Sequence, residues 1–373
     1  MTIQLLINKQ DISPLLSSFP SISDDINGVC RSLDFTVQAA DGLVNYLGQA
    51  VHLYLGKDRW FYGFMETRGW EANGQVTYKV YDPLYFLKKN PRDYYFKNQT
   101  ATQMIAQVLK SVGVKTGSLA NTGAVLAPKL LQKADGDKAI IDALARTYQA
   151  TGKKYWLRFN PVDGPGFGAT IFERTVPSQL WAFQRGVNMI GASFTESLED
   201  HYNMVRLVNR DTGKTVTKKD AALAAAYGMR TFFEEVDKDA AATMERDAAA
   251  LLAEKKKIKT TASMEGFNAK LAMPQFYSGD VIFVEEDMTQ LFGAYHIRAV
   301  TQTVQSSQDI QMSFELQDAP DIPTVQFDDA AQKEKDKKAK AKKAKDKSKD
   351  KDAEGSAGNY SPEMKAAIAK YGT

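Results

Sequence analysis

Two segments far apart in the sequence repeat one pattern, and this repeat limits the possible folds more than any other feature. Residues 48–67 read GQAVHLYLGKDRWFYGFMET, and residues 279–298 read GDVIFVEEDMTQLFGAYHIR. Each has a glycine, a valine two or three residues later, alternating apolar side chains, a polar turn, and then phenylalanine and glycine close together. This alternation is typical of half-buried strands joined in a hairpin. We therefore expect two similar antiparallel β-barrels, although such hairpins also recur in unrelated β proteins.

Other strands with the same two-residue period surround the first copy of the repeat. Apolar side chains alternate with polar ones in three further stretches: Ile3, Leu5 and Ile7; Leu33, Phe35 and Val37; Val76, Tyr78 and Val80. Within the repeat, Gly56-Lys57-Asp58 is a turn signal between two strands. Residues 1–94 are therefore expected to form the first barrel.

The apolar period changes to that of helices in the middle of the chain. Thr100 followed by Gln103 predicts a capping box, because each side chain can satisfy a backbone N–H group at the helix start. A second helix is predicted to end at Gly152, with Ile140, Ile141, Leu144 and Tyr148 on its apolar face. The segments KYWLRF and GATIFERT then predict a hairpin. Residues 95–182 are expected to form a small α+β domain.

Strands return in residues 183–327, which we expect to form the second barrel. Asp211-Thr212-Gly213 predicts a hairpin turn, and residues 310–316 alternate Ile, Met, Phe and Leu with polar side chains. An alanine-rich stretch at about 218–258 predicts a helical insertion. Asp237 and Asp239 precede this helix, Lys255 to Lys257 end it, and Met244, Ala248, Leu251 and Leu252 supply its packing face.

The charge is distributed unevenly along the 373 residues. The chain has 48 basic and 45 acidic residues. Residues 333–354 alone hold eleven lysines and six acidic residues, so the remainder is not basic. This argues against a nucleic-acid-binding body. Cys30 is the single cysteine, which excludes an intrachain disulfide. With no secretory signal and no apolar run long enough for a membrane span, a product made in the cytoplasm is expected.

Few residues suggest catalysis or metal binding. The histidines, His52, His201 and His296, lack the spacing of a metal motif, and we expect no catalytic residues, no metal site and no cofactor. Two acidic clusters are the remaining candidates: Glu285, Glu286 and Asp287 at a predicted hairpin tip, and Glu196, Glu199 and Asp200 before another strand. A glycosidase needs two carboxylates at a defined separation, whereas exposed acidic turns are far commoner.

The C-terminal region differs from everything before it. KEKDKKAKAKKAKDKSKDKD, residues 333–352, interleaves lysine with acidic residues and lacks aromatic side chains. It is more typical of a solvated tether than of a nucleic-acid arm, and residues 328–358 are expected to be a charged, flexible linker. Residues 359–373 predict a short helix with Met364, Ile368 and Tyr371 on one face, which we hypothesise folds onto a partner. A frayed tail without a role is the alternative.

Three further segments resemble a known family. VYDPLYFLKKNPRDYYFKNQTATQMIAQVLKSVGVKTGSL, DGDKAIIDALARTYQATGKKYWLRF and SFTESLEDHYNMV are similar to the tail hub proteins of PBSX-type prophages. Those proteins are similar in turn to the baseplate hubs of contractile-tailed phages and to the late control protein D group. The resemblance covers about residues 1–325 and rests on the order of strands and turns. The lysine-rich run and the terminal peptide lie outside it.

The resemblance implies a structural protein rather than an enzyme. It implies a homotrimer whose six quasi-equivalent barrels form a ring between a hexameric tail tube protein and a central spike protein, at the tail baseplate of a virion. Other baseplate proteins, and a tape measure protein and DNA in transit through a polar channel, are the further partners implied. A tail-associated peptidoglycan hydrolase and a basic-tailed DNA-binding protein are the alternatives.

Overall fold

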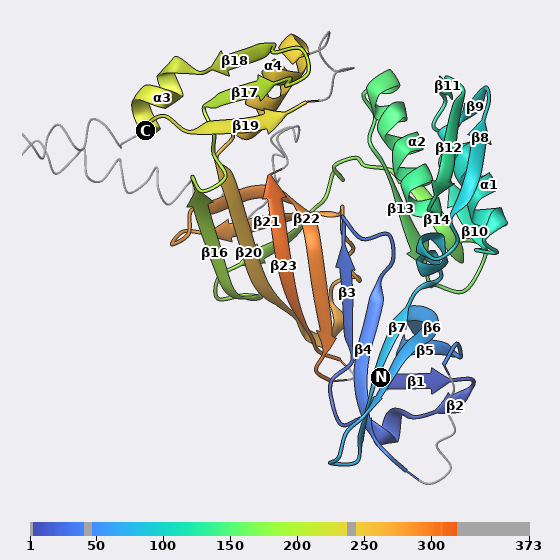
Figure 1. Cartoon of the computed structure of the whole chain (residues 1–373). Helices are drawn as coiled ribbons and strands as arrows, with labels where there is room; N and C mark the ends of the chain where they lie inside the picture. Colours follow the sequence, from blue (N-terminus) through green and yellow to red (C-terminus); the bar gives the residue numbers. More distant parts are fainter. Residues whose placement is uncertain (1–2, 41–46, 237–243, 307, 319–373) are drawn as a thin grey trace, which may run out of the picture. The chain divides into compact units, whose positions relative to one another are not determined.

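Strands from both ends of the chain join in one sheet of 13 strands (Figure 1). The computed structural model describes residues 3–40, 47–236, 244–306 and 308–318. The predicted linker at 328–358 and the predicted peptide at 359–373 lie outside the described residues, as do Asp237 and Asp239.

The sheet contains two groups of strands, which we call the N-terminal and C-terminal modules. The N-terminal module comprises β1 (Ile3–Ile7), β2 (Gln10–Asp11), β3 (Ser21–Asp25), β4 (Ser32–Gln38), β5 (Ala50–Leu55), β6 (Asp58–Trp70) and β7 (Gln75–Tyr81). The C-terminal module comprises β15 (Trp181–Gln184), β16 (Met189–Ser197), β20 (Lys259–Asn268), β21 (Val281–Glu286), β22 (Leu291–Val304) and β23 (Ile310–Asp318). Short 3-10 helices lie at Ser13–Leu15, Pro83–Lys88 and Ala269–Leu271.

The two modules place their strands in the same order. In the N-terminal module the order is β1-β5-β6-β7-β4-β3, and in the C-terminal module it is β15-β21-β22-β23-β20-β16. Counted along the chain within each module, leaving out the short β2, both orders join the first, fourth, fifth, sixth, third and second strands. One pairing differs, because β1 is antiparallel to β5 whereas β15 is parallel to β21. The repeat expected from the sequence is therefore present in the topology.

The expectation of two closed barrels is not met by the described strands. Pairing runs from β16 at one end to β2 at the other without returning on itself. The two modules are joined because β22 is 14 residues long. Its first part pairs with β21, and its later residues, Ala299 to Thr303, pair with β3 of the other module.

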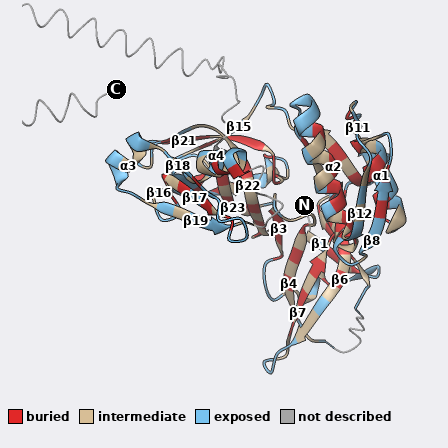
Figure 2. Ribbon diagram, turned by 45° about the horizontal axis from the view of Figure 1, so that its top comes forward, coloured by how far each residue is buried: buried red, intermediate tan, exposed pale blue. Residues whose placement is uncertain are grey.

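One face of this sheet holds the main hydrophobic core. Leu5, Leu33, Val80, Val300 and Phe314 are among its fully buried members, and they come from both modules. Buried and less buried residues alternate along β4 and β7 (Figure 2), as the two-residue period predicts. The strands predicted at Ile3, Leu33 and Val76 are confirmed.

A second core lies in the α+β unit between the modules. Its elements are β8 (Arg92–Phe96), β9 (Gln99–Thr100), α1 (Ala101–Ser111), β10 (Thr116–Leu119), β11 (Val125–Leu126), β12 (Lys129–Ala134), α2 (Gly136–Thr151), β13 (Tyr155–Asn160) and β14 (Gly168–Glu173). The capping box is confirmed, since Thr100 Oγ1 accepts from Gln103 N and Gln103 Oε1 accepts from Thr100 N at 2.9 Å. The predicted hairpin is the β13–β14 pair. Gly152 ends α2 in the left-handed conformation, also as predicted.

The predicted apolar face of α2 is partly wrong. Ile140 is buried, but Ile141 is 54% exposed and Tyr148 is exposed as well. The buried positions beside Ile140 are Ala139, Ala143 and Thr147. Small side chains allow α2 to pack closely on α1, so the side of the helix facing the core is one that hydrophobicity alone does not identify.

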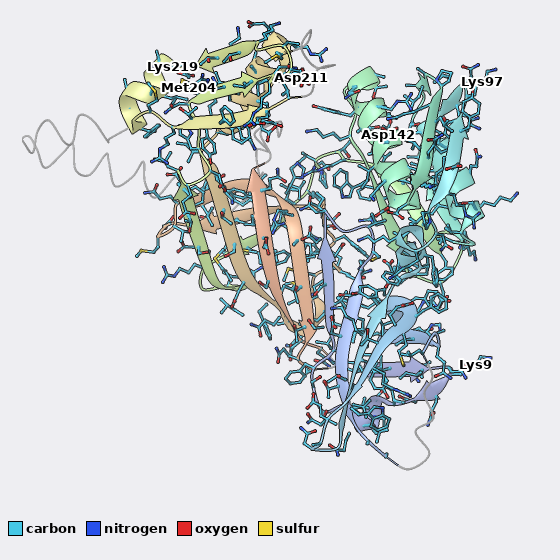
Figure 3. The ribbon with its side chains drawn as sticks, viewed as in Figure 1. Lys9, Lys97, Asp142, Met204, Asp211 and Lys219 are labelled. Carbon is cyan, nitrogen blue, oxygen red and sulfur yellow. The ribbon has the colours of Figure 1, made fainter. Side chains whose placement is uncertain are left out.

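The insertion in the C-terminal module is an α/β unit rather than a helix. It holds β17 (Met204–Val208), β18 (Thr215–Lys219), α3 (Ala221–Tyr227), β19 (Thr231–Glu235) and α4 (Met244–Lys255). β17 pairs with β18 in the predicted hairpin, which places Met204 opposite Lys219 (Figure 3). Val205, Leu207, Val216, Met244 and Ala248 form its core. Sequence reasoning missed β19, because this strand of only five residues lies inside the alanine-rich stretch that was expected to be helical.

Candidate assembly surface

The junction between β3 and β22 shows how one module joins the next. The strands are antiparallel, with Ser21 opposite Thr303 and Ser23 opposite Thr301. The hydroxyl oxygens of each pair lie 3.2 Å apart. Backbone pairing and matched hydroxyls thus hold two modules edge to edge.

The face of the sheet opposite the core is polar along both modules. Ser193 and Ser263 share a hydrogen bond of 2.8 Å, and Lys79 lies 3.4 Å from Asp34. Arg298 pairs with Glu315 and lies 3.5 Å from Asp25. Because its ion pairs join opposite charges and its other groups are mainly hydroxyls and amides, this face combines good hydration with little net charge. We call it the polar face.

A partly buried polar cluster ties the two modules to the α+β unit. The ring of Tyr277 lies close to two guanidinium groups, with Arg31 Cζ at 4.7 Å and Arg158 Cζ at 4.6 Å from its centroid. Arg158 also forms a 3.2 Å ion pair with Asp280. These residues come from the β3–β4 loop, from β13 and from the segment before β21, so one cluster contacts three parts of the fold.

Asp82 lies in the same region and has an unusual environment. It is buried and accepts hydrogen bonds from Arg31 N and Leu84 N, both at 3.0 Å. Burial raises its pKa to about 7, while the two backbone donors oppose that change. A cavity of about 530 Å³ opens here, with Arg31, Asp82, Ile141 and Tyr148 among its lining residues.

The carboxylates singled out from the sequence have structural partners. Glu286 Oε2 accepts from Thr289 Oγ1 and Thr289 N, both at 2.6 Å, and these bonds lower the pKa of Glu286. A carboxyl group held ionised in this way is poorly suited to donate a proton. Glu285 accepts from Gln184, and Asp200 forms a 3.0 Å ion pair with Lys259. Glu196 lies on β16, at the end of the sheet order, whereas Glu285 and Glu286 lie on β21.

The three histidines are each engaged in packing or hydrogen bonding. His52 and His296 are in strands, as predicted, with His52 beside Arg59 and His296 accepting from Arg174 Nε at 3.1 Å. Burial, and next the Arg59 charge, lower the pKa of His52. His201 is buried with its ring 5.5 Å from that of Tyr227. Within the described ranges, no group of three His, Cys, Asp or Glu residues could hold a metal ion.

One prediction of the sequence remains without a structural answer. Met364, Ile368 and Tyr371 lie outside the described residues, so the proposed partner-binding peptide stays a prediction. In the part of the chain that the structure describes, no helix has the length and hydropathy of a bilayer-crossing segment.

Open strand edges were missed entirely by sequence reasoning. Trp70 at the end of β6 is 61% exposed, and Phe194 on β16 is 39% exposed. The signal that identifies such an edge is an aromatic side chain that stays exposed at a strand position. This signal is visible only in the structure, because exposure depends on which strands find a partner.

Comparison with known proteins places this architecture in context. Over 214 residues the chain is 30% identical to the phage-like element PBSX protein XkdQ of Bacillus subtilis (strain 168), a match that covers 56% of the chain and 63% of XkdQ. The crystal structure of the 43 kDa tail protein of prophage MuSo2 from Shewanella oneidensis has a TM-score of 0.63 at 16% identity, covering 87% of this chain and all of that one.

A secretion-system protein has a related fold. An E. coli component of the type VI secretion system, described as structurally similar to the T4 phage tail proteins gp27 and gp5, has a TM-score of 0.53 at 11% identity, covering 86% of this chain and 80% of that one. At such identities these likenesses concern the fold. The sequence itself matches a family pattern over residues 21–317, which include β3 to β7 of the N-terminal module, the unit between the modules and the C-terminal module up to residue 317, and the chain therefore belongs to the YQBQ-like family.

Proposed function

We propose that this chain is a structural hub of a phage tail or phage-like particle, joining a sixfold tail tube to a threefold central spike. The internal repeat carries this proposal. Two modules with one strand order in each chain allow three chains to present six similar units to a sixfold partner. The 30% identity to the phage-like element PBSX protein XkdQ and the fold shared with a prophage tail protein support the same role.

The polar face supports a channel within such a ring. A polyanion or an extended protein passes most easily along a hydrated surface that offers few cationic binding sites. The hydroxyl pairs Ser21–Thr303 and Ser193–Ser263, together with the neutralised Lys79–Asp34 pair, provide that character. We infer that this face is turned to the axis, with tape measure protein and DNA as the molecules that pass.

The proposed role is mechanical and includes no bond cleavage. The surroundings of Glu285 and Glu286 favour a turn-stabilising role over a hydrolytic one. The proposed partners are the tail tube protein, the spike protein and other baseplate proteins, and the proposed location is the tail baseplate of the particle. The expected site of synthesis is the host cytoplasm.

The symmetry of the purified protein tests the proposal. Light scattering of the protein alone should give three times the chain mass of 41.4 kDa. If the trimer forms only with the tube protein, the complex should contain three copies of this chain, and electron microscopy should show a ring. Clearing of a peptidoglycan gel that Glu285→Gln and Glu286→Gln abolish would instead support the hydrolase. Salt-sensitive retention on DNA that depends on residues 333–352 would support the DNA-binding alternative.

A further inference from the structure

β6 has an open edge at the position where its counterpart β22 finds a partner. β22 pairs with β21 and then, from Ala299 to Thr303, with β3. β6 pairs with β5 up to Phe64 and with β7 from Phe64 to Trp70. Within the described residues, no strand covers the other edge of Thr67–Trp70, the stretch equivalent to 299–302 of β22. The equivalence is fixed by a bulge that both strands share, between Met65 and Thr67 and between Ile297 and Ala299.

β16 has the second open edge, and its counterpart is β3. Ser193 pairs with Ser263 of β20, as Ser21 pairs with Asp34 of β4. Ser263 pairs in turn with Glu315, as Asp34 pairs with Lys79. Following these pairs places Phe194 at the position of Ile22 and Glu196 at that of Asp24. Among the described strands, β20 is the only partner of β16, whereas β3 pairs with both β4 and β22.

We propose that β6 of one copy pairs with β16 of a second copy, antiparallel and in the register of β22 with β3. This inference rests on the proposed function and gives its ring a specific contact. The register places five pairs of residues opposite one another: Thr67 and Ser197, Arg68 and Glu196, Gly69 and Thr195, Trp70 and Phe194, and Glu71 and Ser193. The partner is a second copy of this chain, because the template for the pairing is a junction within the chain itself.

The side chains at these positions suit each other. Trp70 and Phe194 are large, exposed and directly opposite in the inferred register, so pairing buries both. The counterpart of Phe194 within the chain, Ile22, is completely buried against the neighbouring module. Arg68 and Glu196 bring opposite charges together. An open edge with exposed aromatic residues favours aggregation unless another strand covers it, and a specific second copy does so.

Repetition of this contact closes a ring. Each copy presents β6 at one place and β16 at another, so the contact is heterologous and runs head to tail. Three copies alternate three β22–β3 junctions with three β6–β16 junctions. The polar faces of six modules then continue from one copy to the next.

Disulfide trapping tests the register directly. Glu71 and Ser193 correspond to Thr303 and Ser21, whose hydroxyls are 3.2 Å apart, so cysteines at both positions meet disulfide geometry. Every variant carries Cys30→Ala. Glu71→Cys with Ser193→Cys should give covalently linked dimers and trimers on a non-reducing gel, as should Thr67→Cys with Ser197→Cys. The matched control, Glu71→Cys with Phe194→Cys, places one thiol on the opposite face and should stay unlinked.

The outcomes separate this inference from the proposed function. A trimer by light scattering in which neither correct pair forms a disulfide overturns the β6–β16 contact and leaves the hub intact. Equal crosslinking in the control overturns the register. A chain that stays monomeric, alone and with tube protein, overturns both proposals.

Charge reversal gives a second readout that needs no cysteine. Arg68→Glu and Glu196→Arg should each shift the protein from trimer towards monomer, and the double variant should restore the trimer. If the double variant is no better than the single ones, Arg68 and Glu196 do not face each other. Circular dichroism of each variant verifies that the chain has folded.

Discussion

Gly48 and Gly279 occupy the same place in the two modules. Both have positive φ, +81° and +87°, and both donate their N–H to a carbonyl of the following long strand, Gly48 to Met65 at 2.7 Å and Gly279 to Ile297 at 2.8 Å. Each acceptor directly precedes the bulge of its strand. The repeat therefore includes the turn that starts each hairpin and the irregularity that follows it. Agreement at both levels is expected of a duplicated module and gives the modules comparable edges.

Replacing these glycines should destabilise the protein to different degrees. Gly48→Ala introduces left-handed strain of about 1 kcal/mol, because no other heavy atom lies within 4 Å of the added Cβ. Gly279→Ala adds a close contact with Trp156, at 3.1 Å, and should cost more. Urea unfolding measures both. Gly191→Ala is the control, since its φ is ordinary and its surroundings are open. Equal stability of all three variants would contradict the strain argument.

The capping box predicts a smaller and coupled effect. Thr100→Ala should cost about 1 kcal/mol of unfolding free energy, because the side-chain acceptor for Gln103 N is lost. Gln103→Ala removes the reciprocal bond to Thr100 N. The two losses should combine non-additively when the double variant is unfolded in urea. Strictly additive losses would mean that the two bonds act independently.

Local patterns in the sequence identified most individual strands and helices. The alternation at Leu33, Phe35 and Val37, the cap at Thr100 and the stop at Gly152 depend on neighbouring residues, and each has the structure its pattern predicts. The two barrels depended on long-range pairing, and in the described residues their strands form one sheet in which no closed barrel is detected. β22 continues past β21 and reaches β3, and the contacting residues Ser23 and Thr301 are 278 positions apart in the sequence. Packing between the modules decides this pairing, and no local pattern can predict it.

The candidate site was the least predictable part. Sequence reasoning chose Met364, Ile368 and Tyr371, which lie outside the described residues, and passed over Trp70 and Phe194. An aromatic residue in a strand is ordinarily part of a core. Its exposure at an unpaired edge becomes evident only once every strand has been given its neighbours.

The single thiol should be inert in the folded protein. Burial, and next the charge of Asp82, raise the pKa of Cys30 to about 12. A rise of the pKa from the ordinary 9.0 to about 12 makes the thiolate fraction roughly a thousandfold smaller near pH 8. We expect Cys30 to react slowly with a thiol reagent in buffer and rapidly in concentrated urea, as followed by absorbance. Comparable rates in both conditions would show that the thiol is accessible and normally ionised.

Asp82 should make stability depend on pH between its two pKa values. In the unfolded chain the carboxyl group loses its proton near pH 3.8, whereas in the folded chain it does so near 7. Between these values the folded state binds more protons, so the contribution of Asp82 to stability falls as pH rises and then levels off above about 7. Asp82→Asn removes this titration, although its amide can accept only one of the two backbone hydrogen bonds.

The comparison needed is therefore the change of stability with pH rather than stability at one pH. The unfolding free energy of the wild type minus that of Asp82→Asn should fall steadily from pH 4 to pH 7, because only the wild type loses stability through this group. Met288→Ala, on the exposed turn between β21 and β22, changes no titratable group, so it serves as the control and should give a difference that stays flat. A flat difference for Asp82→Asn as well would mean that Asp82 is ionised throughout. In that case the charge of Arg31 and the two backbone donors, rather than burial, would control the titration of this carboxyl group.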